Sequence, residues 1–335
     1  MFSDLIVGYL FIGGCAMGFA FILGLLELAN FDRRFGVARS RCDALIGTSF
    51  QPSRSSRISL TRASIQSVRS LGDRFFSFAW TLCVLALSLA IVMLMCDLGR
   101  PDRLLEIIVS TQISAISVGA WSLVLVLVAS AALALGSFAL IDGRAFDGRL
   151  AIALMGLSVV AGMVGFLYTG VLLMEIPSVL AWRTSLIPFV FALSSLSGGI
   201  ALALVAAAFT ESRQNSRSAY SLLMRIDSVV IVAEAIVLMV YLAFYLKSPE
   251  TQGAFDLLLC GGMAALFWMG LVFAGLVLPL FLEVFQAYVP DSRHLLIVAT
   301  LVLVGACCLR ICIVSVAETD PTQVNAALSA YLPLR

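Results

Sequence analysis

The sequence predicts an all-α integral membrane protein with eight transmembrane helices. Of its 335 residues, 61% are hydrophobic and 12% are charged, and a soluble domain carries about twice that charged fraction. Eight apolar stretches are each long enough to cross a hydrocarbon core about 30 Å thick. They are expected to be helices because lipid offers no partner for backbone polar groups, and each is too long for a barrel strand. We expect these spans at residues 5–27, 76–96, 118–141, 151–175, 183–208, 224–246, 258–282 and 295–317.

The eight spans are expected to form one polytopic membrane domain over residues 1–335. The first stretch is expected to be retained, because Met1 to Asp4 carries no basic residue and no small-residue cleavage site stands out. Gly13-Gly14-Cys15-Ala16 in the first span is echoed by Gly198-Gly199-Ile200-Ala201 in the fifth, which runs in the same direction. This weak repeat suits two four-helix bundles, although small residues are common wherever membrane helices pack together.

Basic residues predict the orientation in the membrane. The odd-numbered connections carry 15 arginines, against five Lys or Arg on the other side. Because positively charged loops stay in the cytoplasm, both termini and the connection after the second span should face outward. The first connection, residues 28–75, is rich in Arg and Ser and holds nine of the arginines. It suits either a loop held against anionic lipid or a docking site for a cytoplasmic partner.

Cysteine and histidine usage bears on redox cofactors. The eight cysteines include no CxxC pair, and seven of them, among them Cys260, fall in predicted spans. Single buried cysteines usually act as small apolar side chains. His294 is the only histidine, whereas bis-histidine haem needs two. We therefore expect no haem and no iron–sulfur cluster in this chain.

Two places near the predicted outer face carry polar residues. Asp97-Leu-Gly-Arg-Pro-Asp-Arg follows the second span, and Gly99 and Pro101 suit a tight bend and the start of a short helix. Asp97 is either a helix-capping and interfacial residue, or a proton acceptor or hydrogen-bond partner at this surface. Tyr168 lies about two turns below the outer end of the fourth span. Its phenol can bond a neighbouring backbone or donate to a quinone carbonyl.

Ionisable residues inside membrane spans are costly and therefore indicate function. Glu234 lies near the middle of the sixth span and Arg310 lies within the eighth. They suit either a buried ion pair or part of a proton route. That route would run from an outer site through Arg310 and Glu234 to the inner face. Its outer members are Asp97 and Glu175, and its inner members are Asp227, Glu27 and Glu283.

These segments resemble the NrfD/PsrC family, the membrane subunits of polysulfide-reductase-like complexes. Asp97 to Arg103 and Ile116-Ser117-Val118-Gly119-Ala120-Trp121 are similar to its "DLGRPxR" and "SxGAW" segments. Similar stretches also begin at Tyr168-Thr169-Gly170, at Trp182 and at Val304-Gly305, so the resemblance covers nearly the whole chain.

The resemblance implies a protein of the prokaryotic cytoplasmic (inner) membrane that binds exchangeable menaquinone or ubiquinone near the outer face. It implies a ferredoxin-like [4Fe–4S] partner subunit and, through it, a molybdopterin-type or other catalytic subunit. The centre acting on the terminal substrate would then lie on another subunit, and no nucleic-acid partner is expected. By position, Asp97 and Tyr168 are the quinone-site candidates, and Gly13, Gly14 and Gly18 would let the ring approach the backbone. Some members carry a histidine in the first span, where this chain has residues such as Cys15 and Met17.

The alternative function is a transporter or a purely structural membrane anchor without quinone chemistry. A transporter would be expected to show broken helices and polar midplane residues, usually in both halves of the chain. Here Glu234 is nearly alone at the midplane. Pro188 and Pro279 could kink the fifth and seventh spans, but neither has a polar cluster beside it in the sequence.

Overall fold

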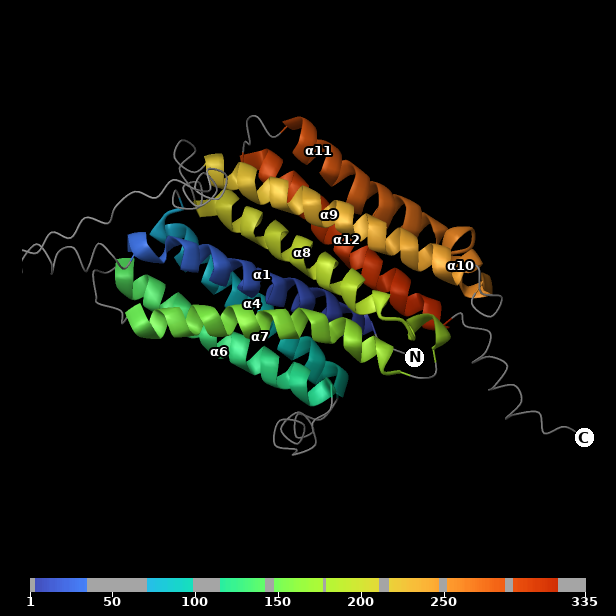
Figure 1. The fold of residues 1–335 in the computed structure, drawn as a ribbon, viewed down its shortest axis with the longest axis horizontal. Coiled ribbons are helices and arrows are strands. Elements are labelled where there is room, and N and C mark those ends of the chain that lie inside the picture. Colours follow the sequence, from blue (N-terminus) through green and yellow to red (C-terminus); the bar gives the residue numbers. More distant parts are fainter. Residues whose placement is uncertain are drawn as a thin grey trace, which may run out of the picture.

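Eight membrane-spanning helices lie side by side in the computed structural model (Figure 1). The structure describes residues 4–34, 71–98, 115–141, 148–176, 179–210, 217–246, 252–286 and 292–318, and these contain no strand. The prediction of an all-α protein with eight transmembrane helices is confirmed. The long helices are α1 (Asp4–Arg34), α4 (Asp73–Leu98), α6 (Ala115–Ile141), α7 (Gly148–Met174), α8 (Leu186–Thr210), α9 (Arg217–Tyr245), the joined pair η2 (Leu266–Val277) and α11 (Leu278–Gln286), and α12 (Ser292–Glu318).

Helices α1 and α8 occupy the centre of the molecule. Figure 1 shows α4, α6 and α7 on one side of this central pair, and α9 to α12 on the other. Helix α1 contacts α4, α7 and α8, while α8 contacts α7, α9 and α12. The central pair is correspondingly well buried, and α8 is the most buried span of all. Because α1 and α8 share a long contact, the division into two four-helix bundles stays a prediction.

Small residues bring the central helices close together. A side chain at Gly18 of α1 would meet the backbone of Ser195 in α8, and one at Gly199 of α8 would meet the backbone of Gly18. Without a hydrophobic driving force between helices in lipid, such close backbone contact supplies much of the packing energy. The outward faces carry exposed apolar side chains, among them Leu135, Val229 and Phe285, as lipid contact requires.

The first two helices are longer than the sequence predicts. Residues 28–34 continue α1, and α4 begins at Asp73, so the connection between them is shorter than 28–75. The apolar run ends at Glu27, but this side chain does not end the helix. Glu27 is buried and accepts a hydrogen bond of 2.6 Å from the Trp80 indole N–H of α4. The polar group is satisfied inside the bundle, so α1 can continue past it.

The seventh span differs most from its predicted bounds of 258–282. The spanning segment is Leu266–Phe285, preceded by the separate helix α10 (Gln252–Leu259). Cys260 follows α10 and therefore lies outside the span. Residues Leu266–Val277 form a π-helix, and the backbone N–H of Leu278 still donates to Phe273 O, five residues back. The change to α-helix falls directly before Pro279, which has no N–H to donate.

Pro188 does not kink α8. It is the third residue of that helix, in the first turn, where a missing backbone N–H leaves no intrahelical bond unmade. Several sequence predictions fall outside the described residues: 35–70 of the Arg- and Ser-rich connection, Gly99 to Arg103 of the segment after α4, and the chain after Glu318.

Candidate functional site

Two tyrosines meet near one end of the bundle. Tyr9 of α1 and Tyr168 of α7 are hydrogen-bonded to each other through their hydroxyls. Tyr9 is buried and Tyr168 is half-buried. Each lies within about 10 Å of its helix end, at 1.5 Å of rise per residue. This is the end where α1 begins, which the arginine distribution assigns to the outer face.

Glycines shape the space around this tyrosine pair. A side chain at Gly119 of α6 would collide with the Tyr168 ring, and one at Gly13 would lie 3.4 Å from the Tyr9 ring. The glycine of the Ser-x-Gly-Ala-Trp segment thus makes room for Tyr168. Asp97, half-buried, lies in the last turn of α4, and Glu175 is exposed in the turn after α7. Both belong to the same end of the bundle, and their quinone and proton roles stay predictions.

Arg310 of α12 lies at the meeting point of α1, α8 and α12. Its side chain is fully buried, and among the described residues its hydrogen bonds go to neutral oxygens. Nε donates to Leu10 O at 3.0 Å, Nη1 to Ser194 Oγ at 3.0 Å and Ala306 O at 2.8 Å, and Nη2 to Ser195 Oγ at 2.8 Å. The Phe11 and Phe191 rings lie 5.9 and 5.4 Å from the guanidinium carbon, within cation–π range.

Gly14 makes room for this guanidinium. A side chain there would lie 2.9 Å from Arg310 Nη2 and 2.7 Å from Ser195 Oγ. Gly18, one turn further along α1, meets the backbone of Ser195. Two of the three glycines assigned to a quinone by resemblance are therefore in helix contacts with α8 and α12. Of these three glycines, only Gly13 adjoins the tyrosine pair.

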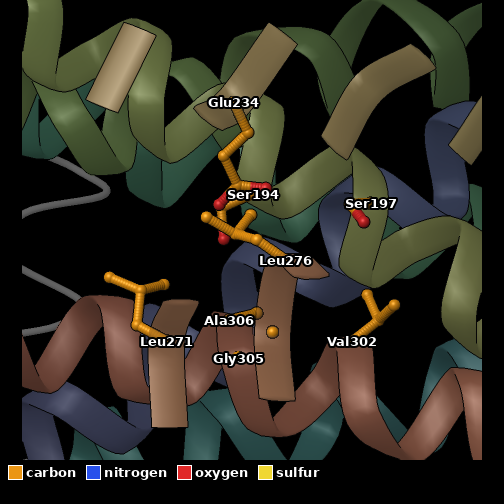
Figure 2. Close-up of a pocket in the computed structure, with 9 residues that line it drawn as sticks. Ser194, Ser197, Glu234, Leu271, Leu276, Val302, Gly305 and Ala306 are labelled. Carbon is orange, nitrogen blue, oxygen red and sulfur yellow. The ribbon is translucent and has the colours of Figure 1, made fainter. Parts of the chain in front are cut away.

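Glu234 and Arg310 are connected through Ser194. Figure 2 shows the Glu234 side chain pointing from α9 towards Ser194 of α8. The Glu234 carboxyl interacts with the Ser194 hydroxyl and electrostatically with Arg310. Since Ser194 Oγ accepts from Arg310, its own hydrogen remains to donate to Glu234. The predicted neighbours thus do come together, with a hydroxyl between them.

A small cavity lies beside Glu234. Its volume is about 10 Å³, close to the minimum that one water molecule needs. Figure 2 shows Ser194 and Glu234 at one side of it and Ser197 at the other. The remaining lining comes from η2 and α12: Leu271, Gly275, Leu276, Val302, Gly305 and Ala306.

Asp227 and Glu283 lie beyond Ser197, and both are buried. Ser197 Oγ donates to Asp227 Oδ1 at 2.7 Å, and Ser228 Oγ donates to Glu283 Oε2 at 2.7 Å. The two carboxyl groups also interact with each other. Glu27, the remaining member of the predicted inner group, is held by Trp80. It therefore belongs to the α1–α4 contact.

Sequence reasoning missed the hydroxyl groups that connect these ionisable residues. Ser194, Ser195 and Ser197 are all buried in α8, and the segment Ser194-Ser195-Leu196-Ser197 in an otherwise apolar span was the available signal. Tyr9 was also missed, because a single tyrosine near a helix end resembles an interfacial anchor.

Comparison with known proteins identifies the family. Residues 54–319 match the family model described as polysulphide reductase, NrfD. The protein is also 30% identical over 156 residues to the C subunit of the polysulfide reductase of Wolinella succinogenes. That alignment covers 45% of this protein and 49% of the relative, so the match spans about half the length of this curated relative. With the family model covering most of its length, the protein belongs to the polysulphide reductase NrfD family.

Proposed function

We propose that this chain is the quinone-reactive membrane anchor subunit of a multisubunit oxidoreductase in a prokaryotic cytoplasmic membrane, with both termini outward. It would exchange electrons between the membrane quinol pool and an iron–sulfur partner subunit. The observation that carries the proposal is the hydrogen-bonded Tyr9–Tyr168 pair, set against Gly119 at the predicted outer end of the bundle in a member of the NrfD family.

The tyrosine pair fits one end of a quinone. Two phenols carry two O–H donors, and their mutual hydrogen bond uses one of them. One O–H therefore remains for a carbonyl oxygen of menaquinone or ubiquinone. When bound, a quinone supplies two-electron, two-proton chemistry. Tyr168 and Tyr9 would hold its oxygen and pass protons towards the outer surface, where Asp97 and Glu175 could accept them.

The partner subunits are proposed from the family and from the name of the relative, which designates one subunit of a polysulfide reductase. A ferredoxin-like [4Fe–4S] subunit would dock at the outer end, near the tyrosine pair. It would connect this protein with a molybdopterin-type or other catalytic subunit. The predicted outward orientation supports docking there. Asp97, in the last turn of α4, and Glu175, in the turn after α7, lie at the same end of the bundle as the tyrosine pair.

Proton translocation is the second part of the proposal. Arg310, Ser194 and Glu234 form a connected polar group inside the bundle, and Asp227 and Glu283 lie on the inner side of it. The Glu234 carboxyl could take up a proton from the inner side and release it outward. The catalytic subunit would determine the direction of electron flow, which is either quinol oxidation or quinone reduction.

The test is turnover of the complex with a Tyr168→Phe substitution. Loss of one hydrogen bond, worth about 0.5–1.5 kcal/mol, should raise KM for a short-chain quinol about two- to tenfold. Tyr241→Phe is the matched control, because this buried hydroxyl of α9 donates to Ala181 O at 3.1 Å and not to Tyr9 or Tyr168. It should leave the quinol KM unchanged.

Two results would contradict the proposal. In the first, the wild-type protein purifies under mild conditions without a quinone and without an iron–sulfur subunit. In the second, the Tyr168→Phe complex keeps the wild-type KM for the quinol. The first result would favour the transporter or the structural anchor.

A further inference from the structure

Asp227 and Glu283 each have one oxygen without a hydrogen-bond partner. The exposed fractions of these residues are 0% and 2%. Ser197 and Ser228 satisfy Asp227 Oδ1 and Glu283 Oε2, whereas Asp227 Oδ2 and Glu283 Oε1 are buried and unpartnered. Ser228, the neighbour of Asp227 on α9, bonds Glu283 of α11, so both carboxyls lie at the same helix contact, where they interact with each other.

Two ionised carboxylates in such a place would repel each other strongly, because burial removes the water that otherwise screens them. One proton between the two groups would remove both the repulsion and the lack of hydrogen-bond partners. It lowers the charge of the pair from two to one, and it supplies a hydrogen bond to oxygens that have none. Interacting carboxyls of this kind lose their protons as a pair and not as separate residues.

The Ser228 hydroxyl suits either position of that proton. It lies 2.9 Å from Met224 O and 2.7 Å from Glu283 Oε2, and it has a single hydrogen to donate. When Glu283 is ionised, the hydroxyl donates to Glu283. When Glu283 carries the shared proton on Oε1, Oε2 is the carbonyl oxygen of the acid and still accepts a hydrogen bond from Ser228.

The cavity beside Glu234 reaches towards this pair. Asp227 and Glu234 are seven residues apart on α9, which is two turns and about 10 Å along one face. Ser197 lines the cavity and also bonds Asp227. A water in the cavity would meet three polar side chains, Glu234, Ser194 and Ser197, which satisfies the two to four partners that a buried water requires.

We propose that Asp227 and Glu283 share one proton, and that a single water molecule in the cavity of Figure 2 connects this pair to Glu234 through Ser197. The pair is the site that loads protons for the inner half of the membrane. Its function in turnover rests on the proposed function, but the shared proton itself does not.

Infrared spectroscopy of the full protein in detergent tests the shared proton without any quinone or partner. A protonated carboxyl has a C=O stretching band that an ionised one lacks. Asp227→Asn, Glu283→Gln and the double variant should each lose the same C=O stretching band. The lost intensity should equal that of one protonated carboxyl per molecule. A carboxamide has the shape of a protonated carboxyl, and its N–H replaces the shared proton. Glu234→Gln identifies the band of the third buried carboxyl, if it has one.

Two results would overturn the shared proton. If the double variant loses twice the band of each single variant, the carboxyls are protonated independently. If none of these substitutions changes the spectrum, both groups are ionised. Repeating the measurement with sodium replaced by choline would then distinguish a bound sodium ion, as the spectrum of a sodium-bound pair would change. Neither result depends on whether the protein binds quinone.

The water connection is tested in the complex, reconstituted in vesicles, with Ser197→Ala and Ser197→Thr. The first removes the hydroxyl between the cavity and Asp227, and the second keeps it. Ser158→Ala is the control, because this buried hydroxyl bonds only Leu154 O of its own helix.

In Ser197→Ala, the number of protons released per electron should fall to the number that quinol oxidation alone releases. Electron transfer in the presence of a protonophore should be unchanged, and Ser197→Thr should restore the lost protons. Wild-type proton release in Ser197→Ala would refute the connection. If the wild-type complex itself shows no quinol-linked turnover, the proposed function has failed and the infrared result stands alone.

Discussion

Gly18→Ala should destabilise the protein by pushing α1 and α8 apart. The added Cβ would collide with the carbonyl of Ser195 and lie 3.3 Å from the backbone nitrogen of Leu196. Backbone atoms cannot rotate out of the way as a side chain can, so the helices must separate locally. Overpacking of this kind costs about 1–3 kcal/mol. The shift would also move Ser195, whose hydroxyl accepts from Arg310 at 2.8 Å.

The assay is thermal unfolding of the full protein in one mild detergent. Gly156→Ala in α7 is the matched control, because a Cβ there has no atom within 4 Å. Alanine favours helix over glycine by up to about 1 kcal/mol, so this variant should unfold at the wild-type temperature or slightly above it.

A second substitution at the same contact sharpens the test. Gly199→Ala places its Cβ against the backbone of Gly18 and Phe19, so both alanines force the same separation. The double variant should therefore lose less stability than the sum of the two single losses. Two results would show that α1 and α8 do not make this close backbone contact. In the first, Gly18→Ala unfolds at the same temperature as Gly156→Ala. In the second, the stability losses of Gly18→Ala and Gly199→Ala add fully in the double variant.

Three other substitutions test contacts described above. Trp80→Phe removes the indole N–H that donates to the buried Glu27, so the free energy of unfolding should fall by about 1–3 kcal/mol. Trp182→Phe, which loses a 3.0 Å bond to Ile313 O, should cost about 0.5–1.5 kcal/mol. An unchanged stability of Trp80→Phe would mean that the bond to Glu27 contributes little. Gly119→Ala should displace the Tyr168 ring and raise the quinol KM at least as much as Tyr168→Phe; an unchanged KM would separate Tyr168 from the quinone. Arg310→Lys keeps the charge but has three donors in place of the guanidinium fork, so the unfolding temperature should fall, and an unchanged value would mean that the four hydrogen bonds contribute little.

The length of the apolar runs predicts the helices well, because each span must satisfy its own backbone in lipid. Their ends are harder to predict. Glu27 looks like the end of a helix until Trp80, 53 residues away, is placed against its carboxylate. The π-helix before Pro279 leaves no clear periodic pattern in an entirely apolar segment. For Glu27, a contact with another helix allows the helix to continue.

The sequence predicts the ionisable residues of the candidate site but not the hydroxyl groups that connect them. Glu234 and Arg310 stand out as intramembrane ionisable residues, and their proximity follows from their depths. The serine between them could not be derived, because Ser194 lies 116 residues from Arg310 and hydroxyls are common in membrane helices. Gly14 and Gly18 were assigned to a ligand by position, whereas in the structure they adjoin Arg310 and α8.

The bond from Arg310 to Leu10 joins residues 300 positions apart and has a consequence for biogenesis. The acceptors of the guanidinium lie on α1, on α8 and in α12 itself, so those on the first and fifth spans must already be in the membrane when the last span arrives. An arginine alone in lipid is unfavourable by several kcal/mol, whereas the same residue among preformed oxygens is not. Stable insertion of the final helix therefore depends on the earlier ones. A protein truncated before Arg310 would leave Leu10, Ser194 and Ser195 facing an unfilled position, giving quality-control proteases a means to recognise incomplete synthesis.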